Sequence, residues 1–180
     1  MKKSSFSLSL RLTVTLSLFV AISIVFGKYL AINVGEVLRF SFENLTIIFA
    51  GIAFGAIPGM LVGVVADLVG CVLVGYTVNP LVTLGALAIG AVSGITFKLT
   101  HKLSTLPRVT ISASVSHLIG SVIIKTFGLA IYYDMPIHIL MLWRLLNYSI
   151  IVAVEVFFIS VLIGNKSIQN QIHKLGGNLK

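Results

Sequence analysis

Charged residues are scarce in this sequence, and acidic residues are the scarcest. Only 10% of its 180 residues are Asp, Glu, Lys or Arg, and five are acidic, while 57% are hydrophobic. Water-soluble domains usually carry about 25% charged residues. A chain this apolar cannot cover a soluble surface with polar side chains, so the composition predicts a protein embedded in lipid.

Cysteine and catalytic motifs are also scarce. The single cysteine, Cys71, lies within an apolar run, which excludes an internal disulfide, a CxxC redox pair and a cysteine-based metal cluster. The sequence has no HExxH or GxSxG motif, and the segment 164–167 lacks the Gly-Lys pair of a phosphate-binding loop. We therefore expect no enzyme activity, no metal site and no bound cofactor.

Six apolar runs are separated by short polar or proline-containing breaks. The second run is short, whereas the others approach or exceed the roughly 20 residues of a membrane-spanning helix. Pro58 and Pro80 cannot donate a backbone hydrogen bond, so they are expected to mark helix ends. The runs, which we take as the approximate helices, are 12–32, 45–57, 59–76, 81–97, 109–132 and 137–164.

Basic residues set the predicted orientation. The net charge of +8 comes from cations between apolar runs rather than from a basic stripe, so no nucleic-acid partner is expected. Cytoplasmic loops are enriched in Lys and Arg, and only six crossings place all three basic groups on that side. The sequence predicts an all-α polytopic membrane protein, a single six-transmembrane-helix bundle over 1–180 with both termini cytoplasmic. The groups are Lys2, Lys3 and Arg11; Lys98, Lys102 and Arg108; and Lys166, Lys174 and Lys180.

A function is expected at the charged residues that the predicted topology does not explain. The fifth run carries polar residues at spacings of three and four, and so does the sixth, which predicts two polar helix faces. A charge at mid-bilayer costs roughly 2.5–3.5 kcal/mol, so these faces should meet each other or a wet cavity. Lys125 and Arg144 with few acids nearby favour an anionic ligand, although a cluster around Asp67 that only fixes helix registry remains an alternative. Lys28 is expected to reach the outer membrane surface. The faces comprise Ser114, His117, Ser121, Lys125, Gly128 and Tyr132, and then Arg144, Asn147, Tyr148 and Glu155. The acids Glu36, Glu43, Asp67, Asp134 and Glu155 all lie in expected outer loops or within spans.

Small residues recur every four positions. Such spacing lets helices approach closely in lipid. Two interpretations stay open, namely packing inside the bundle and a docking face for a partner membrane protein. The residues are Gly51, Gly55, Gly59 and Gly63; Gly90 and Gly94; and Ser17 and Ala21.

Three segments together resemble a known family. The stretches LRFSFEN at 38–44, IFAGIAFG at 48–55 and GVVADLVG at 63–70, followed by Asn79-Pro80, resemble the substrate-binding S components of energy-coupling factor (ECF) vitamin transporters, most of all the folate-specific ones. The resemblance implies a six-helix bundle in a bacterial cell membrane whose outer loops cap a vitamin pocket. It also implies partners, a transmembrane coupling protein and two ABC-type ATPases, with Ser17 and Ala21 docking to the coupling protein.

Folate, the ligand that the resemblance implies, suits the unexplained charges. Arg and Lys bind the carboxylates of its glutamate tail, carboxylate or amide groups can pair with the pterin edge, and aromatic rings can stack on it. We predict Arg39, Lys125 and Arg144 for the anionic groups, Asp67, Asn79 and Asn147 for the ring edge, and Phe40, Tyr133, Trp143 and Tyr148 for stacking. Glu43 faces either the ligand or water.

Other functions remain possible on the sequence alone. The protein could be an S component for another vitamin, such as riboflavin. It could instead be an autonomous proton-coupled carrier that uses Asp67 and His117 as relay groups, or a structural subunit whose polar faces form buried ion pairs.

Overall fold

The computed structural model describes residues 9–34, 38–133 and 136–179. Glu36 and Asp134, expected in outer loops, and Lys2, Lys3 and Lys180, expected in the cytoplasm, lie outside the described residues. The elements are α1 (Leu10–Ile24), the π-helical segment η1 (Val25–Tyr29), β1 (Ile32–Val34), β2 (Leu38–Phe40), α2 (Glu43–Phe54), α3 (Ala56–Leu73), α4 (Pro80–Leu99), α5 (Thr105–Ser116), the π-helical segment η2 (His117–Ile124), α6 (Lys125–Tyr133), α7 (Ile137–Gly164) and α8 (Lys166–Lys174).

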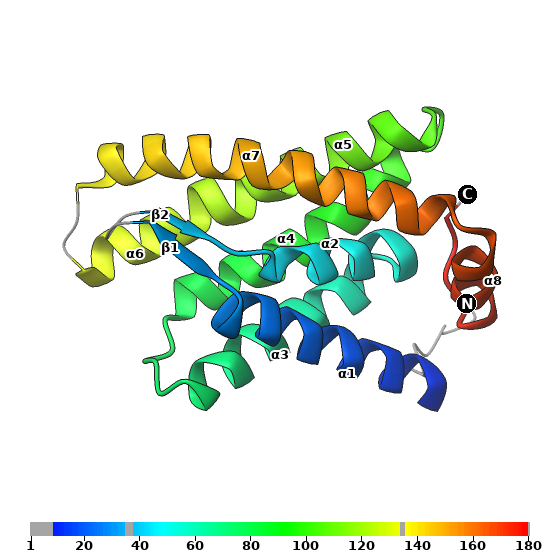
Figure 1. Ribbon diagram of the computed structural model, residues 1–180, viewed down its shortest axis with the longest axis horizontal. Coiled ribbons are helices and arrows are strands. Elements are labelled where there is room, and N and C mark those ends of the chain that lie inside the picture. Colours follow the sequence, from blue (N-terminus) through cyan, green and yellow to red (C-terminus); the bar gives the residue numbers. More distant parts are fainter. Residues whose placement is uncertain (1–8, 35–37, 134–135, 180) are drawn as a thin grey trace, which may run out of the picture.

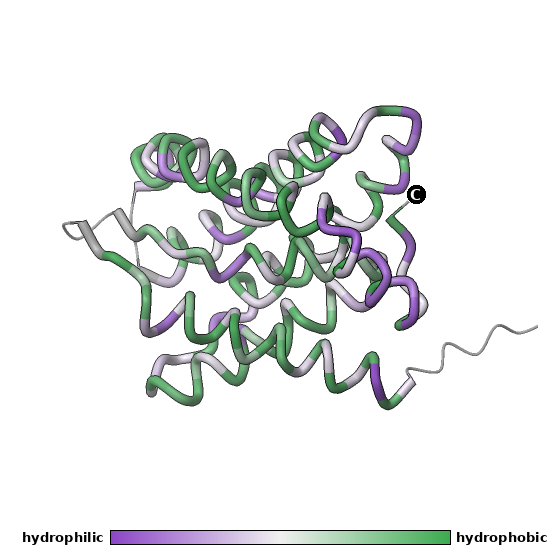
Figure 2. Tube along the Cα trace, turned by 45° about the vertical axis from the view of Figure 1, so that its right-hand side comes forward, coloured by the Kyte–Doolittle hydropathy of each residue, from purple (hydrophilic) through white to green (hydrophobic). Residues whose placement is uncertain are grey.

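The helices form a bundle with two distinct ends (Figure 1). The start of α1, the α4–α5 connection and α8 lie at one end, and the β1–β2 hairpin, the α3–α4 connection and the start of α7 lie at the other. Hydrophobic residues predominate along the helices, whereas hydrophilic residues gather on α8 (Figure 2). The bundle is therefore mainly apolar along its helices, and α8 at one end is hydrophilic.

The outer surface of the bundle is suited to lipid. Among the described residues, five helical stretches are long and apolar enough to cross a membrane. Their outward faces carry large apolar side chains, such as Val14 at 63% exposed, Phe157 at 63% and Val161 at 57%. An apolar surface of this extent is stable in a hydrocarbon environment and not in water. The stretches are Leu10–Tyr29, Ala56–Leu73, Pro80–Leu99, Thr105–Tyr132 and Ile137–Gly164.

The short second run forms the buried helix α2. Nine of its twelve residues are buried, and it packs against α1, α3 and α4. A helix that is apolar on all sides belongs in a core. Ile47, Ile48 and Ile52 of α2 therefore join the main hydrophobic core of the bundle.

A β-hairpin of two three-residue strands forms part of the predicted first outer loop of this helical bundle. β1 and β2 are antiparallel, and Ile32 pairs with Phe40, Asn33 with Arg39 and Val34 with Leu38. The first helical stretch accordingly ends at Tyr29 rather than at residue 32. β-branched and aromatic residues favour this extended backbone once the helix has ended.

The break between α2 and α3 is at Gly55 and not at Pro58. Gly55 has a φ of +97°, in the left-handed region that favours glycine. Pro58 lies in the first turn of α3, where a missing backbone N–H costs no helical hydrogen bond. Pro80 is the first residue of α4, and Asn79 caps that helix. Both prolines therefore lie in the first turn of a helix.

Arg108 is a buried residue of α5 and not a loop cation, which corrects the predicted helix start at 109. Its guanidinium donates to the carbonyl oxygens of Phe97 at 2.9 Å and Leu179 at 3.0 Å. Its Cζ lies 3.7 Å from the centroid of the Phe97 ring. Arg108 thus joins the end of α4 to the C-terminal tail at the α8 end of the bundle.

The repeated glycines of α2, α3 and α4 pack inside the bundle. A Cβ at Gly59 would lie 2.6 Å from the carbonyl oxygen of Gly90, and a Cβ at Gly90 would overlap the carbonyl group of Gly59. A Cβ at Gly51 would likewise lie 2.6 Å from the carbonyl oxygen of Gly90. These glycines allow backbone contact between helices, so the interpretation as internal packing holds for them. Ser17 and Ala21, by contrast, are exposed on α1.

Candidate functional site

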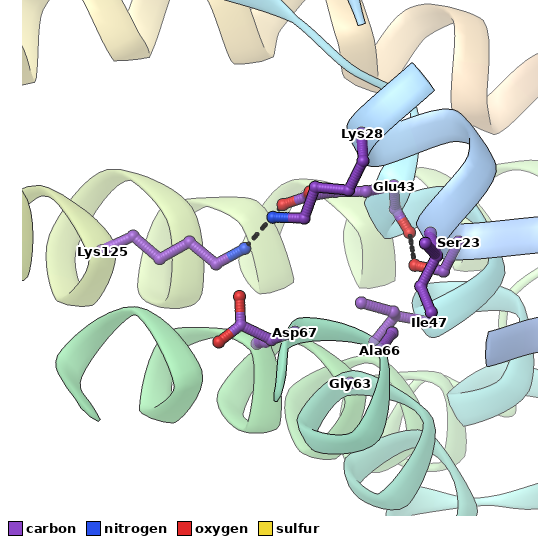
Figure 3. A pocket seen from close by; sticks show the side chains of 10 residues that line it. Ser23, Lys28, Glu43, Ile47, Gly63, Ala66, Asp67 and Lys125 are labelled. Atoms are coloured by element: carbon purple, nitrogen blue, oxygen red, sulfur yellow. Dashed lines mark hydrogen bonds and ion pairs between the residues drawn. The ribbon is translucent and has the colours of Figure 1, made fainter. Parts of the chain in front are cut away.

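Glu43 and Lys125 form an ion pair where α2 begins beside α6 (Figure 3). Lys125 Nζ lies 3.0 Å from Glu43 Oε1, and 4% of the lysine side chain and 26% of the glutamate side chain are exposed. The Ser23 hydroxyl donates to the Glu43 carbonyl oxygen at 2.6 Å and so ties the start of α2 to α1. A lysine buried this deeply needs an anionic partner. The expectation of buried cations with few acids nearby is therefore corrected for Lys125.

Two glycines leave room for this ion pair. A Cβ at Gly27 would lie 2.7 Å from Glu43 Oε2, and a Cβ at Gly85 would overlap the Lys125 side chain. The backbone of η1 therefore lies directly against Glu43, and the backbone of α4 directly against Lys125. Backbone therefore lies against the ion pair on two sides.

Asp67 and Lys28 face the same cavity from α3 and η1. The Thr83 hydroxyl of α4 donates to Asp67 Oδ2 at 2.6 Å. Lys28 Nζ lies 4.0 Å from Cys71 Sγ and 5.7 Å from the centroid of the Tyr76 ring. The Lys28 side chain is thus directed along α3 toward the cavity, and a position at the outer membrane surface stays a prediction for it. The alternative was that a cluster around Asp67 only fixes helix registry. Among the described residues, the contact available for that role is the hydrogen bond between Asp67 and Thr83.

The cavity between these side chains is small. Its volume is about 10 Å³, which suffices for about one water molecule. Binding sites for drug-sized ligands typically measure about 300–1,000 Å³. The lining side chains must therefore separate before a ligand of that size can enter. The lining residues are Ser23, Ile24, Lys28, Glu43, Ile47, Gly63, Ala66, Asp67, Ala86 and Lys125.

Arg144 forms a second polar centre, between α7 and η2. Its Nε donates to the carbonyl oxygen of Ser121 at 3.2 Å, and its Nη2 donates to the Tyr148 hydroxyl at 3.3 Å. The Tyr148 ring in turn packs on the His117 ring, with centroids 4.7 Å apart at 31°. Both acceptors of Arg144 are neutral, so its positive charge is not balanced by an ion pair within the described residues.

π-Helical geometry divides the polar face that spacing predicted for the fifth helix. At the end of η2 the backbone N–H of Lys125 donates to Gly120, five residues back, instead of four. This extra residue rotates everything that follows by part of a turn. His117 and Ser121 consequently contact α7, whereas Lys125 reaches Glu43 of α2. Single π-helical turns of this kind are frequent at functional sites.

Asn79 has a structural role at the start of α4. Its Oδ1 accepts the backbone N–H groups of Leu81 at 3.0 Å and Val82 at 3.4 Å, and its Nδ2 donates to the Gly128 carbonyl at 3.0 Å. Asn79 therefore caps α4 and joins it to α6. Contact with a ligand stays a prediction for this residue.

The other predicted site residues are spread more widely. Phe40 is half-buried in β2, Asn147 is buried on α7, and the Trp143 indole is 41% exposed, as an interfacial aromatic residue would be. The side chains of Arg39 and Tyr133 lie outside the described residues, although the backbone of Arg39 pairs with Asn33. A role in binding stays a prediction for all five.

Sequence reasoning missed Thr83 and Lys28 as members of these polar centres. Thr83 gave no signal, because a threonine in a transmembrane helix commonly bonds its own helix backbone. Helical spacing did place Glu155 on the polar face of the sixth run, since residues seven apart, such as Tyr148 and Glu155, share a helix face, but it did not show its partner. Glu155 pairs with His117, which lies on a different helix.

Comparison with solved proteins shows the fold. No protein-family model and no curated protein sequence matches the chain. The crystal structure of FolT bound with folic acid matches with a TM-score of 0.70 and 24% identity, covering 86% of this chain and 93% of that one. The S component of a bacterial ECF transporter matches with a TM-score of 0.62 and 19% identity, covering 84% and 95%. The chain therefore has the fold of these two proteins over nearly their whole length.

Proposed function

We propose that this protein is a folate-binding S component of an ECF-type importer, in a bacterial cell membrane. It captures folate from outside the cell without an ATPase site of its own and delivers it inward with an energising module. The observation that carries the proposal is the fold shared with FolT, whose solved structure holds folic acid. The cationic centres at Lys125 and Arg144 support it, because folate carries two carboxylates.

The Lys125–Glu43 pair explains how a closed cavity can accept an anionic ligand. A ligand carboxylate can replace Glu43 Oε1 as the acceptor at Lys125 Nζ without leaving the lysine unpaired. Because Glu43 is partly exposed and Lys125 is not, the glutamate is the partner that can turn toward water. This exchange opens the cavity at its most polar point.

Arg144 is expected to bind the second anionic group of the ligand. Replacing it with alanine should weaken folate binding about tenfold, which corresponds to one charge-assisted hydrogen bond of roughly 1.5 kcal/mol. Calorimetric titration of both proteins with folate measures this change. Ser149→Ala is a matched control on the same helix, and we expect it to stay within about twofold, because Ser149 is exposed. Unchanged affinity in Arg144→Ala would remove Arg144 from the site.

We propose six membrane crossings with both termini in the cytoplasm. The five long stretches together with the buried α2 provide them, and the start of α1 and α8 share one end of the bundle. In a Cys71→Ala background, a cysteine at Thr77 should react with a membrane-impermeant maleimide on intact cells. A cysteine at Ser104, in the connection at the opposite end, should react only after permeabilisation. The reverse pattern would invert the proposed orientation.

The proposed partners are a transmembrane coupling protein and two ABC-type ATPases. α1 offers them an exposed face on which Ser17 and Ala21 lie beside Val14, Leu18 and Val25. Small residues on a lipid-facing helix allow a partner helix to approach closely. This face is free of the internal glycine packing that occupies α2, α3 and α4.

A further inference from the structure

His117 and Glu155 form a second buried pair that the proposed binding step does not use. His117 Nε2 lies 2.6 Å from Glu155 Oε2, and the two side chains are 2% and 0% exposed. The other ring nitrogen, Nδ1, lies 3.1 Å from the Ser121 hydroxyl. Both nitrogens of the imidazole are therefore engaged, which fixes the orientation of its ring.

The imidazole of His117 contacts both residues that hold Arg144. Ser121 bonds His117 through its hydroxyl and accepts from Arg144 through its carbonyl oxygen. Tyr148 packs on the imidazole through its ring and accepts from Arg144 through its hydroxyl. His117 is thus connected to the Arg144 guanidinium through both Ser121 and Tyr148. These four residues form a closed ring of contacts.

We propose that His117 and Glu155 are positioning residues, which hold the Arg144 guanidinium in the orientation that receives a ligand carboxylate. This inference rests on the proposed function. Of the five N–H groups of Arg144, two donate to Ser121 and Tyr148, and the other three make no hydrogen bond within the described part of the chain. Those three remain available for a carboxylate, and fixing the long side chain beforehand lowers the entropy lost on binding.

A purely structural role for the pair makes a different prediction. Buried ion pairs can often be replaced by apolar residues of similar volume without loss of stability. The double variant His117→Leu/Glu155→Leu should therefore still fold, since it leaves neither partner alone in the core. If the pair positions Arg144, this variant keeps its fold and loses affinity.

The experiment compares folate with pteroate, which has the same ring system and lacks the glutamate. In the double variant we expect about tenfold weaker folate binding and a change of at most about twofold for pteroate. The same double variant made in an Arg144→Ala background should show no further loss for folate. Ser149→Ala, on the exposed side of α7, is the matched control and should bind both ligands as the original protein does. Equal losses for folate and pteroate, or additive losses with Arg144→Ala, would overturn the inference.

A ligand-free measurement separates this inference from the proposed function. The thermal stabilities of His117→Gln, Arg144→Ala and their combination form a double-mutant cycle in detergent. Coupled effects support the ring of contacts, and additive effects overturn it, whether or not the protein binds folate. If the original protein binds no folate but the cycle shows coupling, the ring stands while the proposed substrate fails.

Discussion

Replacing Lys125 with methionine is expected to weaken folate binding about 100-fold, the largest effect of any single substitution in the site. The lysine is buried, lines the cavity and is the cation paired with Glu43. Losing a buried charge-assisted contact to a carboxylate costs about 3 kcal/mol, and every 1.4 kcal/mol is tenfold in affinity. Calorimetric titration of the purified variant with folate measures the change.

Glu43→Gln is the matched control for this prediction, and its expected effect has the opposite sign. If Glu43 competes with the ligand for Lys125, removing its charge should leave folate affinity unchanged or raise it. The combination Lys125→Met/Glu43→Gln should recover the thermal stability lost in Lys125→Met, because no unpaired charge remains, and should still bind folate weakly. If the double variant binds folate as the original protein does, Lys125 has no part in binding.

Replacing Gly90 with alanine is expected to produce the largest loss of stability. The added Cβ would overlap the carbonyl group of Gly59, and backbone atoms cannot move aside as a flexible side chain can. Overpacking of this kind typically costs about 1–3 kcal/mol. Thermal unfolding in detergent, followed by circular dichroism, should show a clear decrease in the Tm of the variant.

Gly164→Ala provides the comparison for Gly90→Ala. Gly164 is also helical, at the end of α7, and nothing lies within 4 Å of the Cβ that alanine would add there. Alanine is favoured over glycine in a helix by up to about 1 kcal/mol, so this variant should match or exceed the original Tm. Equal decreases in both variants would show that the α3–α4 contact is not close enough to require glycine.

The helical part of the fold could be predicted from the sequence because apolar run length is a strong signal. Lipid demands long apolar segments, and the runs ended close to where α4 and α7 end. The hairpin at β1 and β2 was missed, because three-residue strands fall below the length at which periodicity is visible. The break at Gly55 was assigned to Pro58, since a positive φ leaves less trace in a sequence than a proline does.

The site was harder to predict than the fold, because it depends on contacts between helices. Spacing placed His117, Ser121 and Lys125 on one face by assuming a regular α-helix, and the π-helical segment η2 separates them. It could not show that Glu43, 82 positions from Lys125, would be its partner. The pairing of Arg144 with a carbonyl oxygen of η2 was likewise invisible, because a backbone acceptor leaves no mark in the residue pattern.

The most direct test of the proposed function is a calorimetric titration of folate into the purified protein, without ATP or any partner. Calorimetry is preferable to fluorescence because the single tryptophan, Trp143, is 41% exposed and can be insensitive to the ligand. We predict saturable one-to-one binding in the submicromolar range, as expected of a subunit that captures a scarce vitamin on its own. No binding of folate under these conditions, with or without binding of riboflavin, would contradict the proposed substrate.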